Sequence, residues 1–128
     1  MTGPEVTAII PVFNDRPSLE IALKASLETL SGITSAFEIL VAEDGSTDGS
    51  TEFVRHYVAQ DSRVRLLHHD ERQGRGRALN RAIRESGGTI VCYYDVDLAT
   101  DMQHLSALIS AIRQGSDIST GSTFTCQR

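Results

Sequence analysis

Short apolar segments of strand length alternate along the chain with longer segments in which apolar residues recur every three or four positions. The strand-like segments cover residues 6–12, 38–42, 63–68, 89–94 and 117–120. The segments with helical spacing cover residues 16–31, 50–60, 77–86 and 102–114. Runs of β-branched and aromatic residues are typical of buried strands, and the longer spacing is typical of helices that bury one face. The alternation predicts an α/β fold with a mostly parallel sheet and helices on both faces.

One predicted strand leads directly into two acidic residues. The strand-forming run 89–94 is followed by Asp95-Val96-Asp97. Open α/β sheets place their ligand crevice at the carboxyl ends of strands. Asp95 and Asp97 share a side while the chain stays extended, and two close carboxylates repel each other unless a cation or a proton lies between them. Oxygen ligands favour a hard ion such as Mg²⁺ or Mn²⁺, so the pair predicts a metal or phosphate site rather than the start of a solvated loop.

A loop dense in turn-forming residues ends the second predicted strand. In residues 43–50, Asp44 can accept a hydrogen bond from a nucleobase N–H or a ribose hydroxyl. The same stretch can also form a helix N-terminus, with Ser46, Thr47 or Asp48 as its cap. Both interpretations can hold at once.

A basic, glycine-containing loop precedes the third predicted helix. Gly74 and Arg75 lie in it, and five of the chain's twelve basic residues lie between Arg72 and Arg84. Such a loop at a helix N-terminus suits a diphosphate, although a solvated helix face explains the same charges equally well. At the end of the preceding strand, His68 and His69 point to opposite faces and are not expected to share a metal ion.

Composition narrows the class of protein. A chain of 128 residues with 40% hydrophobic residues supports one domain, spanning residues 1–128. The net charge of −5 argues against nucleic acid as a partner. Cys92 and Cys126 have no metal-ligand spacing, and we expect both to be free thiols in a reducing compartment. No apolar run reaches the length of a membrane span, so we expect a cytoplasmic protein.

Four segments together resemble a known family. They are residues 8–14 (AIIPVFN), 41–50 (VAEDGSTDGS), 73–80 (QGRGRALN) and Asp95-Val96-Asp97. In order and spacing they are similar to the inverting family-2 glycosyltransferases, whose Rossmann-like fold is called GT-A. The match covers residue 6 to about residue 121, nearly the whole chain.

The resemblance implies a donor site for a UDP- or GDP-linked sugar. It implies that Pro11, Phe13 and Asp15 line a nucleotide pocket and that Asp44 contacts the base or the ribose. It also implies that Asp95 and Asp97 bind Mg²⁺ or Mn²⁺ and, through it, the donor diphosphate. With the basic loop included, the candidate substrate-binding residues are Pro11, Phe13, Asp15, Asp44, Gly74, Arg75, Asp95, Val96 and Asp97.

The sequence is most similar to the dolichyl-phosphate mannosyl- or glucosyltransferase branch. That similarity implies a polyprenyl-phosphate or glycan acceptor and a place at the cytoplasmic membrane face. The chain departs from the branch at Ala99 and Thr123, where Gln and Arg are usual. The acceptor half, with its catalytic base, is expected to be absent from this chain, which would leave a nucleotide-binding half.

Two alternatives remain open from the sequence. Asp95-Val96-Asp97 could be the nucleophile and acid of a HAD-type phosphohydrolase, although such folds carry the motif on the first strand and here it follows the fourth predicted one. A non-catalytic nucleotide-binding or dimerising module is the other alternative. An uncovered sheet edge would make a homodimer plausible.

Overall fold

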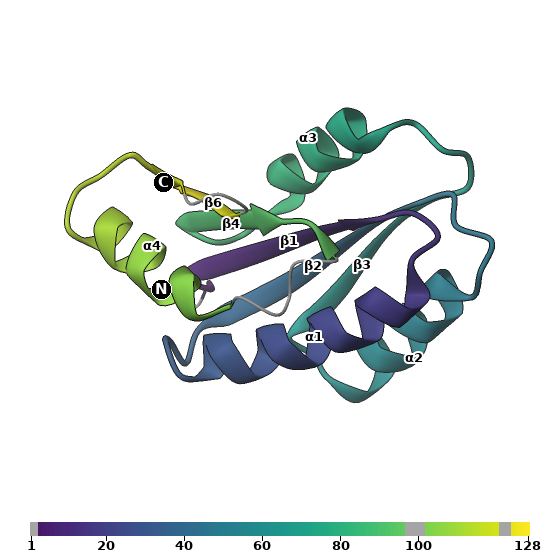
Figure 1. Cartoon of the computed structure of the whole chain (residues 1–128), viewed down its shortest axis with the longest axis horizontal. Helices are drawn as coiled ribbons and strands as arrows, with labels where there is room; N and C mark the ends of the chain where they lie inside the picture. The colour runs from purple at the N-terminus through teal and green to yellow at the C-terminus, as the bar shows by residue number, and fades with distance from the viewer. Residues whose placement is uncertain (1–2, 97–101, 121–123) are drawn as a thin grey trace.

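The computed structural model describes residues 3–96, 102–120 and 124–128, which form a single mixed sheet with helices on both faces (Figure 1). The strands are β1 (Val6–Val12), β2 (Phe37–Asp44), β3 (Val64–His69), β4 (Ile90–Tyr94), β5 (Ile118–Thr120) and β6 (Phe124–Gln127). Their order across the sheet is β3-β2-β1-β4-β6-β5. β3, β2, β1 and β4 are parallel, whereas β6 runs antiparallel to both of its neighbours. The predicted α/β class and mostly parallel sheet are confirmed.

The helices are α1 (Arg16–Ser31), α2 (Ser50–Gln60), α3 (Arg75–Glu85) and α4 (Gln103–Arg113). Figure 1 shows α3 on one face of the sheet, opposite α1, α2 and α4. The larger apolar core lies beneath these three helices and includes Leu19, Val54 and Leu105. A smaller core lies beneath α3, where Ala78 and Ala82 pack on the sheet. None of the described helices is both long and apolar enough to cross a bilayer.

The predicted boundaries of β1 are confirmed, whereas β2 extends beyond the predicted residues 38–42 at both ends. Every residue of β1 and of β2 is buried, so neighbouring elements cover both faces of these strands. Such strands read as nearly continuous apolar runs. Pro11 lies near the end of β1, opposite Ala42 in the parallel register. On the α1 side, the hydroxyl groups of Ser26 and Tyr94 share a buried hydrogen bond of 2.6 Å, and burial raises the pKa of Tyr94.

The chain reverses its direction of travel across the sheet between β1 and β4. From β1 it proceeds outward through β2 to β3, and it then returns to place β4 on the other side of β1. The carboxyl ends of β1, β2 and β4 therefore meet at one edge of the sheet, beside the start of α3, and this is where an open α/β sheet places its ligand crevice. This is where Asp95 lies.

One strand was missed by the sequence prediction. The segment after the fifth predicted strand was expected to hold no further element, yet Phe124–Gln127 forms β6 and inserts between β4 and β5. Only Phe124 and Cys126 of its residues are buried. A four-residue strand carries too little apolar pattern to be recognised, because its stability comes from pairing with strands that are distant in sequence.

The expectation of two free thiols was wrong. Cys92 on β4 and Cys126 on β6 lie directly opposite each other in the antiparallel register and form a disulfide with a Cα–Cα separation of 4.0 Å. Both residues are fully buried. Their sequence separation of 34 residues gave no sign of this pairing, because β6 itself was not predicted. The expected reducing compartment thereby loses its basis, and the cytoplasmic location stays a prediction.

Reduction of this disulfide should destabilise the chain. Closing a loop across 34 residues contributes about 3–4 kcal/mol to the free energy of unfolding in the chain-entropy account. We expect the intact mass of the air-purified protein to increase by two hydrogen atoms on reduction, and its melting temperature to fall. A Cys92→Ala/Cys126→Ala double variant should melt at the same temperature with and without dithiothreitol. An unchanged wild-type mass after reduction would contradict the disulfide.

Candidate functional site

A pocket of about 280 Å³ lies at the carboxyl ends of β1, β2 and β4, beside the start of α3. Its lining residues are Pro11, Val12, Phe13, Asp15, Ala42, Asp44, Arg72, Arg75, Ala78, Asp95 and Val96. Seven of the nine predicted substrate-binding residues are therefore gathered around one cavity. Gly74 lies beside it, in hydrogen-bond contact with Asp44. Asp97 lies outside the described residues.

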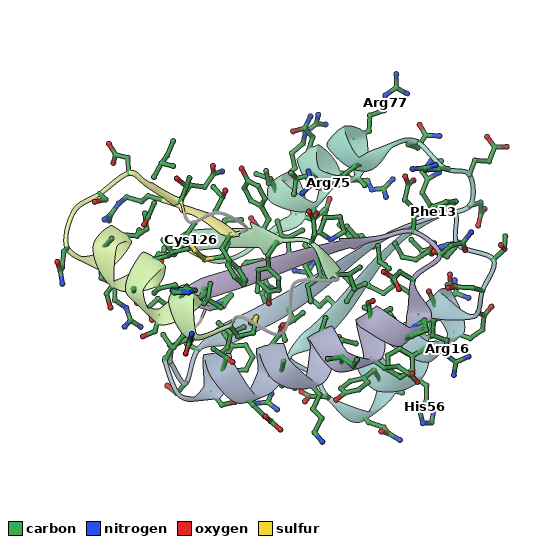
Figure 2. All side chains as sticks on the ribbon, in the orientation of Figure 1. Phe13, Arg16, His56, Arg75, Arg77 and Cys126 are labelled. Carbon is green, nitrogen blue, oxygen red and sulfur yellow. A yellow bond between two sulfur atoms is a disulfide. The ribbon has the colours of Figure 1, made fainter. Side chains whose placement is uncertain are left out.

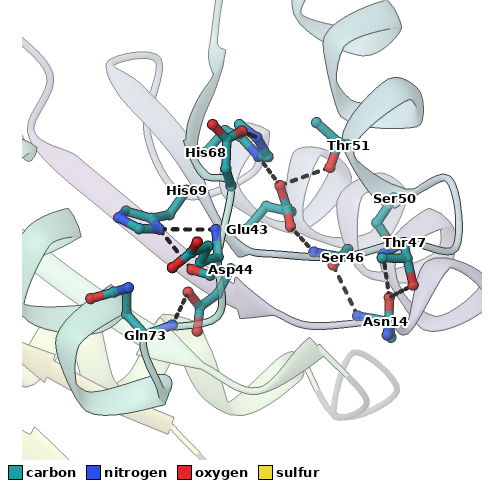
Figure 3. Close-up of polar contacts among 12 residues, drawn as sticks. Asn14, Glu43, Asp44, Ser46, Thr47, Ser50, Thr51, His68, His69 and Gln73 are labelled. Carbon is teal, nitrogen blue, oxygen red and sulfur yellow. Dashed lines mark hydrogen bonds and ion pairs between the residues drawn. The ribbon is translucent and has the colours of Figure 1, made fainter.

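The Asp44 carboxylate fixes the basic loop to the end of β2. Its Oδ1 accepts a hydrogen bond of 2.8 Å from the backbone N–H of Gln73, and its Oδ2 accepts one of 2.9 Å from Gly74 (Figure 3 draws the bond from Gln73). Asp44 is only 4% exposed. Two backbone donors thus satisfy a buried charge and place the start of α3 against the pocket.

Gly45, the next residue, makes this close approach possible. It has a φ of +72°, and a Cβ there would lie 2.7 Å from the backbone nitrogen of Arg72. A side chain would therefore collide with the backbone of the basic loop and would also strain the left-handed conformation. Glycine is required at this position for the two loops to meet.

Glu43 organises a second set of contacts on the other side of β2. Its side chain is fully buried and accepts hydrogen bonds from the Ser46 backbone N–H, the Thr51 hydroxyl and His68 Nδ1 (Figure 3). His68 Nε2 lies 2.7 Å from Asp70 Oδ1. Because both ring nitrogens face carboxylates, the geometry favours the imidazolium form, which donates at both positions.

The pKa values of this pair shift apart. Burial raises the pKa of Glu43, but hydrogen bonds from Ser46, Thr51 and His68 outweigh it and leave the pKa below its usual value. The hydrogen bond to Glu43 raises the pKa of His68 above its ordinary 6.5, against the smaller effect of burial. The two groups therefore form an ion pair that joins β2 to β3 at the edge of the site.

The loop after β1 is joined to the loop after β2 by polar side chains. Asn14 Oδ1 accepts a 2.6 Å hydrogen bond from the backbone N–H of Thr47, and Ser46 Oγ accepts one of 2.9 Å from the backbone N–H of Asn14. Asp48 Oδ2 accepts a hydrogen bond from the backbone N–H of Arg16, the first residue of α1. Asp15 stands at the N-cap position of α1, but its side chain makes no capping bond, and Asp48 takes that role from a neighbouring loop. The Asp15 side chain is thereby left to line the pocket.

Opposite charges meet across the pocket at Arg75 and Asp95. Arg75 donates from Nε and Nη2 to Asp95 Oδ1, at 2.9 and 2.7 Å. Both side chains are about half exposed, so the pair is accessible to an incoming ligand. At the other end, the Arg72 guanidinium lies over the Phe13 ring, 4.1 Å from its centroid, and Phe13 is 38% exposed. The cavity thus offers a flat aromatic and cationic surface at one end and an exchangeable ion pair at the other.

The Asp95 carboxylate suits a hard divalent ion that is bound jointly by the protein and by a substrate. Asp95 offers oxygen, the ligand that Mg²⁺ and Mn²⁺ prefer. Among residues 3–96, 102–120 and 124–128, no group of three or more His, Cys, Asp or Glu could hold a metal ion. Mg²⁺ is usually bound by one or two carboxylates together with substrate phosphates rather than by a complete protein cage, and this donor set fits that mode.

Three residues of the site carried no predicted role. Glu43 was seen only as part of a turn-rich loop, and His68 was set aside because adjacent histidines diverge. Arg72 was counted among basic residues without a specific contact. The pairing register supplies the missing information for two of them, since it places Glu43 beside His68 on neighbouring strands.

The chain belongs to glycosyl transferase family 2, whose model it matches over residues 7–128. It is 40% identical to the glycosyltransferase AglD of Haloferax volcanii over 98% of this chain, and 30% identical to the dolichol-phosphate mannosyltransferase of Pyrococcus furiosus over 94% of this chain. Those alignments cover 21% and 33% of the two relatives, so the chain spans about a fifth to a third of their length. The predicted family is confirmed.

Solved structures agree with the fold. The mannosyltransferase PcManGT from Pyrobaculum calidifontis, in complex with GDP-Man and Mn²⁺, is 32% identical, with a TM-score of 0.63 over 74% of this chain and 28% of that chain. Residues 1–349 of TarS from S. aureus, in complex with UDP, superpose with a TM-score of 0.69 over 89% of this chain and 34% of that chain. At 22% identity, the second similarity supports the GT-A architecture alone.

The Glu43–His68 pair gives the stability of the chain a defined pH dependence. Because the folded pKa of His68 is raised, its contribution is complete below the unfolded value of 6.5 and is lost as the pH rises through the folded pKa. Because the folded pKa of Glu43 is lowered, its contribution is present above 4.5 and is lost as the pH falls through the folded pKa.

We therefore expect wild type to lose about 1 kcal/mol of unfolding free energy relative to His68→Gln between about pH 6 and about pH 9, as one charge-assisted hydrogen bond becomes neutral. Urea unfolding at both pH values measures this difference. His56→Gln is the control, because that exposed ring bonds Gln60 and contacts no carboxylate in the described part of the chain. Parallel profiles for wild type and His68→Gln would contradict the ion pair.

Proposed function

We propose that this chain is the nucleotide-sugar-binding part of an inverting glycosyltransferase that uses a UDP- or GDP-linked sugar. The observation that carries the proposal is the gathering of Phe13, Asp44, Arg75 and Asp95 around one cavity at the switch point of the sheet. Membership of glycosyl transferase family 2 supports the reaction class. The similarity to a mannosyltransferase in complex with GDP-Man and Mn²⁺ supports this kind of donor.

We propose that different pocket residues bind different parts of the nucleotide-sugar donor. The Phe13 ring, held by the Arg72 guanidinium, is the proposed stacking surface for the nucleobase. The carboxylates of Asp15 and Asp44 lie where hydrogen bonds from the base or the ribose can be accepted. Arg75 is the cation nearest to Asp95 and is proposed to bind the diphosphate. Pro11, Val96 and the backbone at Gly74 complete the wall.

Asp95 and Asp97 are the proposed ligands of a divalent ion, Mg²⁺ or Mn²⁺. When bound, such an ion supplies positive charge that stabilises the nucleoside-diphosphate leaving group. Asp95 Oδ1 is occupied by Arg75 in the free chain, so this carboxylate is already oriented and neutralised before a donor arrives. Preorganisation of this kind reduces the cost of assembling the site on binding.

We infer the acceptor of the reaction from relatives that are longer than this chain. We propose a polyprenyl phosphate as the acceptor, by similarity to the dolichol-phosphate mannosyltransferase of Pyrococcus furiosus. An acceptor site and a catalytic base are then expected outside this chain, with this domain working at the cytoplasmic face of a membrane. A homodimer through the sheet edge formed by β5 remains a proposal, consistent with the 63% exposure of Ile118.

Calorimetric titration of UDP and GDP, each with and without Mn²⁺, tests the donor site. We expect one nucleotide to bind in a metal-dependent way, and its affinity to fall about tenfold or more in Asp97→Ala and in Asp95→Asn, the equivalent of one lost charge-assisted interaction. Asp117→Ala removes an exposed carboxylate just before β5 and should bind like wild type. Equal affinity in all four proteins, or no binding to wild type, would overturn the proposal.

A further inference from the structure

The outer face of α3 carries a stripe of arginines that the donor pocket does not use. Ala78 and Ala82 face the sheet, whereas Arg77, Arg81 and Arg84 follow one another at helical spacing on another face. Together with Gln73 and Asn80 they line a groove of about 350 Å³. We call this the arginine groove. In Figure 2, Arg77 extends away from the sheet, whereas Arg75 lies nearer to it, and Arg75 lines the donor pocket instead.

The arginines of this groove differ from most others in the chain because they lack acidic partners. Arg63, Arg65 and Arg113 each form an ion pair with a carboxylate at 2.7–2.8 Å. In the described part of the chain, no carboxylate lies within ion-pair distance of Arg77, Arg81 or Arg84. Arg77 has only a 3.3 Å hydrogen bond to the Gln73 side chain. Three positive charges are thus concentrated on one face of a protein whose net charge is −5.

Arg81 adds an observation that a solvated surface does not explain. Its Nη2 atom is buried and has no hydrogen-bond partner among the described residues. A guanidinium cannot lose its charge at physiological pH, and a buried donor without an acceptor costs free energy. The exposed Arg77 and Arg84 can be solvated by water, whereas the Arg81 nitrogen is buried and reaches an acceptor in the groove only if its side chain shifts.

We propose that the arginine groove binds a phosphate group, as a site separate from the donor pocket. Planar guanidinium groups match the tetrahedral oxygens of phosphate with paired hydrogen bonds, and the charge of three of them exceeds that of a phosphate dianion. The side-chain amides of Gln73 and Asn80 add neutral donors along the rim. The phosphate accepts from Arg77 and Arg84 and, once the Arg81 side chain has turned toward it, from Arg81 Nη2, which then gains the acceptor that it lacks.

Titration of the 128-residue chain with inorganic phosphate at constant ionic strength tests this site. Calorimetry and the NMR signals of the arginine side chains serve as the readouts. We expect inorganic phosphate to shift the Arg81 signal, and its affinity to fall about tenfold or more in Arg81→Gln. Arg55→Gln removes an exposed arginine from α2 and should bind phosphate like wild type. The shift of the Arg81 signal separates the groove from the donor pocket, where Arg75 is proposed to bind a diphosphate.

Stability measurements keep the test independent of folding defects. Arg81→Gln should melt no lower than wild type without phosphate, because an unsatisfied charge has been removed, and should lose the stabilisation that phosphate gives wild type. If Arg81→Gln fails to fold, Arg77→Gln/Arg84→Gln serves the same purpose. Equal phosphate affinity in wild type, Arg55→Gln and the groove variants would overturn the site and leave only diffuse charge.

The source of the phosphate is identified by a second comparison. Vesicles of phosphatidylcholine with phosphatidic acid present phosphomonoester head groups, and pure phosphatidylcholine vesicles are the control. One outcome is that wild type sediments only with the vesicles that contain phosphatidic acid, with inorganic phosphate reversing the binding and Arg81→Gln abolishing it. That result supports the site and assigns it to lipid head groups. Binding of soluble phosphate without sedimentation supports the site and assigns it to a free phosphate compound. Absence of both kinds of binding would overturn the proposal.

Discussion

The structure depends on two buried carboxylates at the end of one strand. Glu43 and Asp44 are adjacent on β2, so their side chains leave the sheet on opposite faces. Each side chain is buried, which is tolerable only because backbone N–H groups and polar side chains from other loops satisfy its oxygens. Removing charges from water in this way costs free energy, and the hydrogen bonds that offset that cost are the ones that place the loops around the pocket.

Each carboxylate orders a different wall of the site. Asp44 accepts hydrogen bonds from the backbone N–H groups of Gln73 and Gly74. The first turn of α3 therefore starts beside the cavity, where Arg75 forms an ion pair with Asp95. Glu43 accepts hydrogen bonds from Ser46, Thr51 and His68 and thereby orders the loop after β2. That loop is hydrogen-bonded in turn to Asn14 in the loop after β1. The proposed donor pocket and the arginine groove thus share α3 as a common support. Its inner side serves the pocket, and its outer side carries the unpaired guanidinium groups.

The sequence was informative where burial or local chemistry determined the structure. β1 was predicted with its observed boundaries because all seven of its residues are buried. The candidate substrate-binding residues could be predicted to converge because parallel strands end at the same edge of a sheet. By contrast, β6 and the Cys92–Cys126 disulfide depend on pairing across 34 residues, which no local pattern reveals. The ion pair of His68 and the hydrogen bond from the Arg16 backbone to Asp48 likewise depend on the register and on contacts between loops.

Amide hydrogen exchange at Gln73 and Gly74 tests most directly whether the β2 carboxylates build the site. In wild type both amides should be protected, because each donates to an Asp44 oxygen. In Asp44→Ala they should exchange about tenfold faster or more, while the Ser46 amide, bonded to Glu43, keeps its wild-type rate. Unchanged exchange at Gln73 and Gly74 would show that the loop holds its place without Asp44 and would contradict this account.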